Sequence, residues 1–399
     1  MTLATMLKNR PKPKPKPGPL WTGPGGEGPN GGVTQSMIGR FLNCRERFRI
    51  RYVEGLESAE RWSHRLGYGE MWHKCEETFA GTIPGGVAPN RHEWEIPLKQ
   101  HCIDLCRQHP LQQDEINHWY QVCKVQFPLY VQWWAKHPDQ VAKTSLLQEQ
   151  VFDVPYKLPS GRTVRLRGKW DGVSLIGKGK SAGVYLDEHK TKGDIDPVRM
   201  QRQLGFDLQT MTYLVALEVY RRQTTDLGGW AQNGISGVHY NVVRRPLSGG
   251  KGSIVRHKPS KSNPQGESAE EYYARLGGII ETATGLTVPE WGMGPGDHFY
   301  FMRWRCEVSA GDITRFRREF LDPILEQMCD WWRHVDKTAP FEIGCDGDLS
   351  YPVSALHWRH PFGVYNSLDE GGATEYDAYI ESGSTAGLRR AEALFGELK

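Results

Sequence analysis

The sequence lacks the features that would place the protein in a membrane or direct it out of the cell. No apolar run in its 399 residues approaches the roughly 20 residues that a membrane-spanning helix needs. The first twenty residues contain no apolar stretch followed by a small-residue cleavage site, so we expect no secretory signal. We therefore expect a cytoplasmic protein without membrane contact.

Paired cysteines and excess charge are also missing. The eight cysteines include no Cys-x-x-Cys pair, which argues against a disulfide framework and a structural zinc site. The formal net charge is only +3, which excludes a nucleic-acid coat protein that binds by bulk charge. Any nucleic-acid binding must therefore be local.

Low-complexity sequence is confined to the beginning of the chain. Residues 1–33 contain KNRPKPKPKPGP followed by GPGGEGPNGG, and this Pro-, Lys- and Gly-rich composition predicts a disordered arm. Order is expected to begin at Thr34, where Thr34 or Ser36 can cap a helix. We divide the chain into the arm 1–33, a main domain 34–345 and a C-terminal extension 346–399.

The hydrophobic periods predict a mixed α/β domain. Apolar residues at helical spacing precede a stretch of strand-like alternation, and further helices follow it. An aromatic stripe in the third helix, which includes Trp119 and Phe127, is interpreted as core. The expected strands are a meander over 146–192, then 235–243 and 298–308. The expected helices are 34–52, 61–79, 114–136, 198–222, 267–281 and 310–334.

Two carboxylates and a lysine come together in the predicted meander. Glu188 and Lys190 lie two apart in its third strand, so alternation puts them on one face, toward Asp171 of the second strand. Asp187 then faces away, so we expect Asp187→Asn to have only a mild effect on cleavage. This grouping can hold a divalent cation, with the backbone carbonyl of His189 as a further ligand. Alone the pattern is weak, because charged residues alternate on many solvated strands.

Five motifs that occur in a fixed order along the chain support a functional interpretation of this pattern. Together they resemble the RecB-like nucleases of the PD-(D/E)xK superfamily. The resemblance covers residues 36–345 and implies that family's α-β-β-β-α-β core, with added helices. The motifs are the opening helix Ser36–Leu56, Gly69-x3-His73-x3-Glu77, Gly168-Lys-Trp-Asp171-Gly-Val, Glu188-His-Lys190-Thr and Gln209-x3-Tyr213.

The resemblance also implies roles for single residues. Lys190 would orient the attacking water, and Asp171 and Glu188 would act with it as the catalytic set. Gln209 and Tyr213 lie one helical turn apart and would contact the substrate. Taken singly, Tyr213 could equally be core packing and His73 an ordinary helix histidine. The implied ligands of Mg²⁺ or Mn²⁺ are His73, Asp171, Glu188 and the carbonyl of His189.

Many relatives in that family carry an iron–sulfur cluster, and the sequence argues against one here. Cys44 and Cys345 resemble the first and second cluster ligands, but no cysteine follows Cys345. His357 and His360 are poor substitutes, since four thiolates are the usual requirement. We expect a colourless protein without iron.

Two basic segments are candidates for contact with nucleic acid. SGGKGS at 248–253 lacks the phosphate-loop pattern, so we expect no nucleotide-driven motor in this chain. It belongs to the basic insertion 244–266, which could contact DNA phosphates or be merely solvated. The arginines from Arg40 to Arg51, with Tyr120, Trp133 and Trp134, could line a channel for an unpaired strand.

The sequence as a whole predicts a metal-dependent DNA nuclease. We expect an exonuclease that acts on DNA with a free end in recombination, repair or phage DNA processing, with a helicase or recombinase as a possible partner. One alternative is a structure-specific endonuclease of the same fold. The other is a DNA-binding subunit without catalysis, against which the intact Asp171, Glu188 and Lys190 argue.

Overall fold

The computed structural model describes eleven stretches of the chain. They group into two units, and each is described by itself. The larger, here called the sheet unit, consists mainly of Glu60–Ile324, and the smaller, the terminal unit, combines segments from both ends of the sequence. The described stretches are residues 18–43, 45–58, 62–81, 93–135, 143–177, 182–223, 234–246, 254–285, 300–335, 388–395 and 398.

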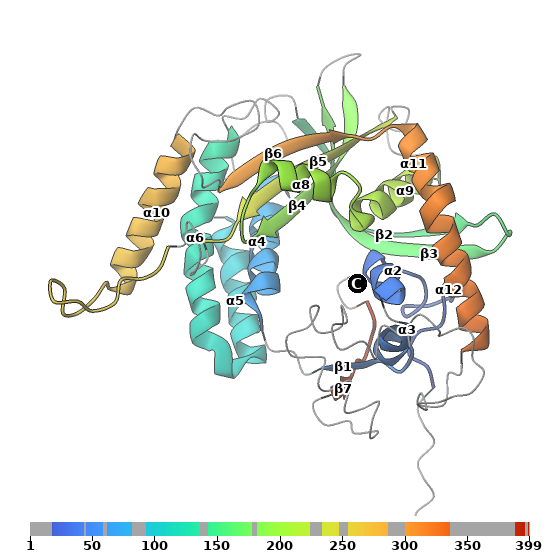
Figure 1. Cartoon of the computed structure of the whole chain (residues 1–399), viewed down its shortest axis with the longest axis horizontal. Coiled ribbons are helices and arrows are strands. Elements are labelled where there is room, and N and C mark those ends of the chain that lie inside the picture. Colours follow the sequence, from blue (N-terminus) through green and yellow to red (C-terminus); the bar gives the residue numbers. More distant parts are fainter. Residues whose placement is uncertain are drawn as a thin grey trace, which may run out of the picture. The chain divides into compact units, whose positions relative to one another are not determined.

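A five-stranded mixed sheet forms the centre of the sheet unit (Figure 1), in the order β2-β3-β4-β5-β6. Its first three strands form the predicted antiparallel meander: β2 (Lys143–Lys157), β3 (Thr163–Ile176) and β4 (Gly183–Lys192). β5 (Ile235–Arg244) returns parallel to β4, and β6 (Phe301–Glu307) pairs antiparallel with β5. A parallel return requires a crossover, which the helices between β4 and β5 provide.

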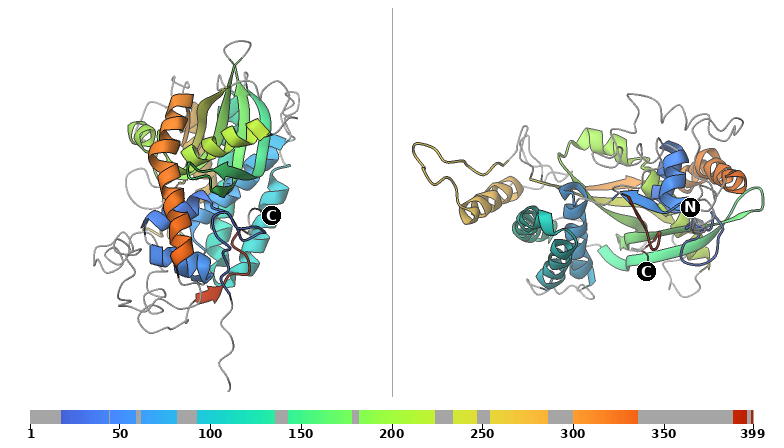
Figure 2. Two further views of the ribbon diagram at one scale, coloured as in Figure 1. Left: turned by 90° about the vertical axis from the view of Figure 1, so that its right-hand side faces the viewer. Right: turned by 90° about the horizontal axis from the view of Figure 1, so that it is seen from below.

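Four helices carry a large aromatic core beside the sheet. α4 (His64–Gly81), α5 (Glu95–Gln108) and α6 (Gln113–Ala135) pack on one another, with the short 3-10 turn Pro110–Gln112 before α6. α10 (Ala269–Gly285) packs on α6 (Figures 1 and 2). The predicted aromatic core is confirmed by a set of buried rings: Trp72, Trp119, Phe127, Tyr130, Trp133 and Trp134.

This burial corrects one functional interpretation. Trp133 is 5% exposed and Trp134 is 3% exposed, so neither ring is available to stack on a base. Arg303 lies over the Trp134 ring at 3.2 Å and covers it from within the protein. The predicted stacking channel therefore loses two of its three aromatic residues to core packing.

The helix predicted over 198–222 is two helices. α8 (Pro197–Leu204) ends before Gly205, and α9 (Leu208–Gln223) begins after Asp207. The Asp207 carboxylate accepts a hydrogen bond from the Thr210 backbone N–H at 3.2 Å, which is the pattern of a helix cap. The break lets α9 contact β2, β3 and β5.

The helix predicted over 310–334 is continuous but changes its winding. α11 (Ala310–Phe316) begins at a capping box, in which Ser309 and Asp312 each accept from the other's backbone N–H. A π-helical turn, η5 (Arg317–Leu321), joins it to α12 (Asp322–His334). The sequence period predicted a helix here but did not show the wider turn.

The terminal unit pairs the two ends of the chain. α2 (Gln35–Asn43), α3 (Arg45–Phe48) and the π-helical turn η1 (Arg49–Val53) lead into β1 (Leu56–Ser58). β1 pairs antiparallel with β7 (Leu388–Arg390). The C-terminal extension thus contributes a strand to the same unit as the opening helix, whereas the sequence had separated them into two regions.

Order also begins earlier than Thr34. Trp21 is fully buried, its indole N–H donates to the Gly32 carbonyl at 2.8 Å, and its ring packs on Trp332 at 4.9 Å. The Leu20 backbone N–H donates to the Val53 carbonyl at 2.7 Å. Residues 18–33 are therefore part of the terminal unit, because one tryptophan supplies the apolar anchor that the Gly- and Pro-rich composition concealed.

The predicted fold class is confirmed. α4, the β2-β3-β4 meander, α9 and β5 follow one another as an α-β-β-β-α-β core, and the remaining helices are additions to it. None of the helices in the described stretches combines the length and the hydropathy that a membrane-spanning segment needs.

Candidate active site

The site begins where β3 separates from β4. Their pairing ends at Gly172 and Asp187, so Asp171 is the first β3 residue beyond the ladder. Its Oδ2 accepts a hydrogen bond from the His189 backbone N–H at 2.8 Å. The carboxylate therefore lies in the opening between the two strands, beside the Glu188-His189-Lys190 segment of β4.

Glu188 and Lys190 share one face of β4, as the alternation predicted. The Lys190 Nζ lies 2.8 Å from the Glu188 carboxylate, whose side chain is fully buried. The same Nζ donates to the Gln209 Oε1 at 2.8 Å, so α9 holds the lysine from the other side. Tyr213, one turn further along α9, is close enough for Glu188 and Asp171 to influence its pKa.

Asp187 faces the opposite side of β4. Its carboxylate accepts from the Ser174 hydroxyl, lies 3.1 Å from the Lys143 Nζ and lies 3.1 Å from the His239 Nδ1. These partners belong to β2, β3 and β5. The two adjacent acids of the Asp-Glu-His-Lys sequence therefore have separate environments, the first structural and the second directed to the site.

His73 reaches the site from the middle of α4. Gly69, one turn earlier, lets the helix approach β4, since a Cβ there would lie 3.2 Å from the Thr191 hydroxyl. The His73 Nδ1 lies 3.6 Å from the Asp171 Oδ1. The spacing of the Gly-x3-His motif thus has a packing reason as well as a chemical one.

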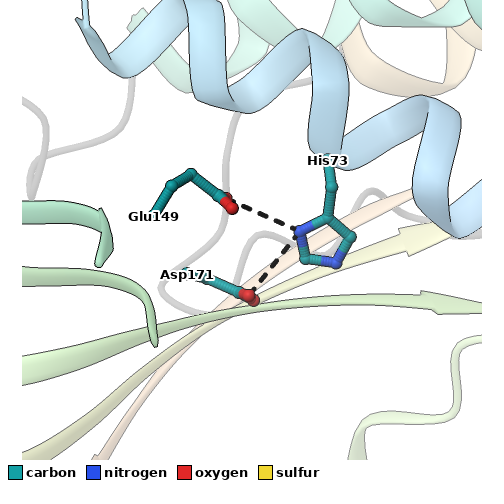
Figure 3. Close-up of side chains that lie close together, drawn as sticks. All are labelled: His73, Glu149 and Asp171. Atoms are coloured by element: carbon teal, nitrogen blue, oxygen red, sulfur yellow. Dashed lines mark ion pairs between the residues drawn. The ribbon is translucent and has the colours of Figure 1, made fainter. Parts of the chain in front are cut away.

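Glu149 of β2 is a site residue that the sequence analysis missed. The register of β2 and β3 places it opposite Asp171, and its Oε1 lies 4.0 Å from the His73 Nδ1 (Figure 3). Its φ of 47° is the one positive value outside glycine in the described stretches. Its other oxygen forms an ion pair with Lys169. No spacing motif marks Glu149, because it becomes a neighbour of Asp171 only through strand pairing.

Burial raises the pKa values of the site carboxyl groups. It raises the pKa of Asp171 to about 6, although the His189 N–H and Lys190 oppose the change. It raises the pKa of Glu188 to about 7, where Lys190 opposes and Asp171 reinforces it. Burial also raises the pKa of Glu149. Anionic carboxylates are therefore poorly compensated here, which is typical of functional sites and of cation sites.

A buried polar network supports His189 from behind. The His189 Nδ1 lies 2.9 Å from the Asn241 Nδ2 and 3.4 Å from the Glu76 carboxylate, and Asn241 also lies 2.9 Å from Glu76. Glu76 was missed, whereas Glu77 of the quoted motif is partly exposed and pairs with Lys74. Buried networks of this kind fix the backbone that they support.

The glycine of the Gly-Lys-Trp-Asp motif also has a structural reason. A Cβ at Gly168 would lie 2.6 Å from the Phe152 ring and 3.0 Å from the Tyr213 ring. Glycine therefore allows these rings, 5.3 Å apart in an edge contact, to pack beside the strand that carries Asp171. Tyr213 is partly buried, so the packing role that the sequence left open is real.

The donor set fits a divalent cation. The facing atoms of His73, Glu149 and Asp171 all lie within 4.8 Å of one another, and they are carboxylate oxygens and an imidazole nitrogen. The Oε1 of Glu149 is buried and accepts no hydrogen bond from any described residue. A cation would supply the missing partner.

The comparison with protein families agrees with this geometry. The family model of the PD-(D/E)XK nuclease superfamily matches residues 33–310. The chain belongs to this superfamily. It is therefore placed among hydrolases that act on nucleic acids, which typically use divalent metals at carboxylates such as those described above. A comparison with curated proteins gives no significant match.

Several predicted functional residues of this PD-(D/E)XK chain are paired within the protein, are buried, or fall outside the described residues. Arg49 is buried and paired with Glu54, and Arg51 pairs with Glu57, so these two arginines are engaged within the protein. In the basic insertion, Arg244 and Arg245 are buried, whereas residues 255–264 are exposed. Outside the described residues lie Cys44, Cys345, His357, His360 and the segment 248–253.

Proposed function

We propose that the chain is a metal-dependent deoxyribonuclease that hydrolyses phosphodiester bonds from free DNA ends. The observation that carries the hydrolytic part is the meeting of Asp171, Glu188 and Lys190 where β3 and β4 separate. Asp171, Glu188, His73 and the His189 carbonyl would hold Mg²⁺ or Mn²⁺. When bound, the cation neutralises phosphate charge and makes water a better nucleophile.

Lys190 acts as a charged donor in this proposal. Burial alone would lower the pKa of Lys190, but Glu188 and Asp171 raise it, so the ammonium stays protonated. A protonated lysine cannot take a proton from water. It orients the attacking water and stabilises the negative charge that develops on the phosphate oxygens.

Gln209 and Tyr213 serve the same site from α9. Gln209 holds the Lys190 ammonium through a 2.8 Å hydrogen bond. Burial raises the pKa of Tyr213, and Glu188 and Asp171 raise it further, so its hydroxyl remains a neutral donor. We assign both residues to contact with the strand that is cut.

Action from ends rests on the RecB-like order of the five motifs. The burial of Trp133 and Trp134 removes the aromatic channel as a support. The same resemblance supports a role in recombination, repair or phage DNA processing in the cytoplasm, beside a helicase or recombinase. A structure-specific endonuclease and a DNA-binding subunit without catalysis are the alternatives.

The test compares end-labelled linear DNA with relaxed closed circular DNA, in Mg²⁺, in Mn²⁺ and with a chelator. The proposal expects cleavage of linear DNA alone, in either metal and not with the chelator. Equal cleavage of circles would identify an endonuclease. Binding without cleavage in either metal would identify a non-catalytic subunit and overturn the proposal.

A further inference from the structure

The carboxyl ends of β4 and β5 bring three basic residues together. Lys192 and Arg244 are paired at the ends of these parallel strands, and the Arg245 backbone N–H donates to the Lys192 carbonyl at 2.7 Å. Lys192 lies two residues after Lys190, so it shares the face of β4 that carries Lys190. Positive charge therefore continues from Lys190 to the end of the strand, beyond the residues that would hold a metal ion.

Arg245 is a buried cation that lacks a counter-charge. It is 8% exposed, and it forms no ion pair with any residue in the described stretches. Its Nη1 donates to the His64 carbonyl at 3.2 Å, whereas its Nε is buried and has no hydrogen-bond partner there. The neighbouring Arg244, by contrast, lies 3.8 Å from the Asp194 carboxylate. A buried guanidinium without an anion is costly, so Arg245 points to an anionic ligand.

Lys192 and Arg199 add charge at this end of the sheet without neutralising it. Neither side chain forms a hydrogen bond or an ion pair with the described part of the chain. Burial lowers the pKa of Lys192, and neighbouring cations lower it further, although Asp207 opposes them. These cations are Lys190, Arg245 and Arg199. Cations that lie close together repel one another, and a bound anion removes this repulsion.

An exposed aromatic ring lies on the crossover between β4 and β5. Phe206 follows the end of α8 and is 78% exposed. Its neighbour Asp207 is close enough to influence the pKa of Lys192, so the ring lies near the cations. α8 lies beside β4 and β5 (Figure 1), where the Tyr240 hydroxyl donates to the Leu204 carbonyl at 2.8 Å. An exposed ring beside cations is typical of surfaces that stack a base and neutralise its phosphate.

We propose that Lys192, Arg199 and Arg245 bind a backbone phosphate of the substrate strand, and that Phe206 stacks on a base of the same strand. The inference rests on the proposed function, because its ligand is the nucleic acid that the active site would cut. An unpaired strand fits this surface, since bases stacked within a duplex offer no free face to a side chain. Free inorganic phosphate would use the cations but not the ring, so the two ligands give different results.

Binding without metal tests the proposal, because a chelator keeps metal-dependent cleavage from consuming the probe. The probe is a fluorescent oligothymidylate of about ten nucleotides, and its anisotropy gives the affinity for the full chain at several salt concentrations. Lys192→Met and Arg245→Met should each weaken binding by about five-fold at about 0.1 M salt. Each should also lower the slope of log affinity against log salt by about 0.7, the value for one phosphate contact on a single strand.

Phe206→Ala separates the strand from free phosphate. It should weaken oligothymidylate binding by about ten-fold and leave the salt slope unchanged, because it removes a ring and no charge. Inorganic phosphate, compared with chloride at equal ionic strength, should raise the melting temperature of Phe206→Ala as much as that of the wild type. The same addition should not raise the melting temperature of Arg245→Met.

Arg221→Met is the matched control. Arg221 lies on α9, and its guanidinium already has a counter-charge in Glu218 at 3.0 Å. This variant should keep the affinity and the salt slope of the wild type. Thermal denaturation without DNA shows that each variant is folded, and Lys192→Met should melt no lower than the wild type because it removes a repelled charge. If Arg245→Met does not fold, Lys192→Met decides the outcome.

The results separate this inference from the proposed nuclease function. Wild-type affinity and salt slope in Lys192→Met would overturn the phosphate contact. Wild-type affinity in Phe206→Ala would overturn the base contact and, with it, the unpaired strand. Neither result bears on catalysis, which Glu188→Gln tests on linear DNA in Mg²⁺. Binding that depends on Lys192 and Phe206, without cleavage in Mg²⁺ or Mn²⁺, would support this surface while the proposed catalytic function fails.

Discussion

The Lys143 ammonium lies 3.1 Å from the Asp187 carboxylate, on the side of β4 that faces away from Glu188. Asp187 is 3% exposed, and Ser174 and His239 complete its environment. Burial alone would raise the pKa of Asp187, but Lys143, His239 and Ser174 lower it below its usual range. The Asp187 carboxylate, next to the proposed catalytic residue Glu188, therefore stabilises the sheet.

Asp187→Asn should destabilise the protein, whatever its effect on cleavage. The change leaves the partly buried Lys143 ammonium without its counter-ion beside a buried side chain, and the free energy of unfolding should fall by about 3 kcal/mol. Urea denaturation without metal measures this. Asp153→Asn, at a partly exposed ion pair, should cost less than about 1 kcal/mol. Equal losses in the two variants would contradict the structural role of Asp187.

Substitutions in the proposed catalytic set should show the opposite behaviour, with loss of cleavage and little loss of stability. Asp171→Asn, Glu188→Gln and Lys190→Ala should each reduce cleavage by about a thousand-fold or more. Burial raises the pKa of Glu188 to about 7, so a neutral glutamine there should leave the unfolding transition nearly unchanged. Rates on labelled linear DNA, compared with urea midpoints, check both statements. If Asp187→Asn is folded but inactive while Glu188→Gln is active, the roles assigned to these two acids are reversed.

Gln209 should act through Lys190. Gln209→Ala removes the acceptor that holds the ammonium at 2.8 Å, and kcat should fall by about ten-fold with little change in the free energy of unfolding. Gln223→Ala, at the exposed end of the same helix, is the control for helix composition. If Gln209→Ala changes only KM, its contact with substrate matters and its contact with Lys190 does not.

Glu267 should make the stability of the folded protein depend on pH in the acidic range. Its carboxylate accepts from Arg275 and from the His257 backbone N–H, and these hydrogen bonds lower its pKa to about 2. The unfolded value is near 4.3. A lowered pKa means stabilisation that is complete above the unfolded value and is lost as the pH falls toward about 2.

Glu267→Gln should therefore lower the melting temperature at pH 7, and the difference from the wild type should shrink between about pH 4 and pH 2. Thermal denaturation at a series of pH values gives this comparison. Glu270→Gln, at an exposed position of α10, should show no such trend. A difference that is constant with pH would mean that side-chain packing, and not the charge of Glu267, is responsible.

Local sequence patterns predicted correctly which side chains share one face of a helix or strand. The period-two alternation correctly separated Asp187 from Glu188 and Lys190, because neighbouring residues of a strand must point to opposite sides. The aromatic stripe of α6 was correctly interpreted as core. The same stripe could not also line a channel, since Trp133 and Trp134 are buried in the core of the sheet unit.

The sequence predictions were wrong where contacts between segments far apart in the sequence determine the structure. Trp21 stands in a Gly- and Pro-rich stretch, and its ring packs on Phe48 and on Trp332, which lies more than three hundred positions later. Similarly, Leu56–Ser58 becomes a strand because Leu388–Arg390 pairs with it. Local composition describes only the residues that are near one another in the sequence. These contacts are made with residues far away in the sequence, so composition could not predict them.

The sequence by itself determined the order of the core elements, the catalytic candidates Asp171, Glu188 and Lys190, and the side of the strand on which the last two lie. These depend on spacing along a single element. Only the tertiary structure brought Glu149 opposite Asp171, His73 to within 3.6 Å of Asp171, and Lys143 against Asp187. Those relationships depend on strand register and on how closely a helix approaches a sheet. Register and approach are set by the packing of the whole core, which no local spacing encodes.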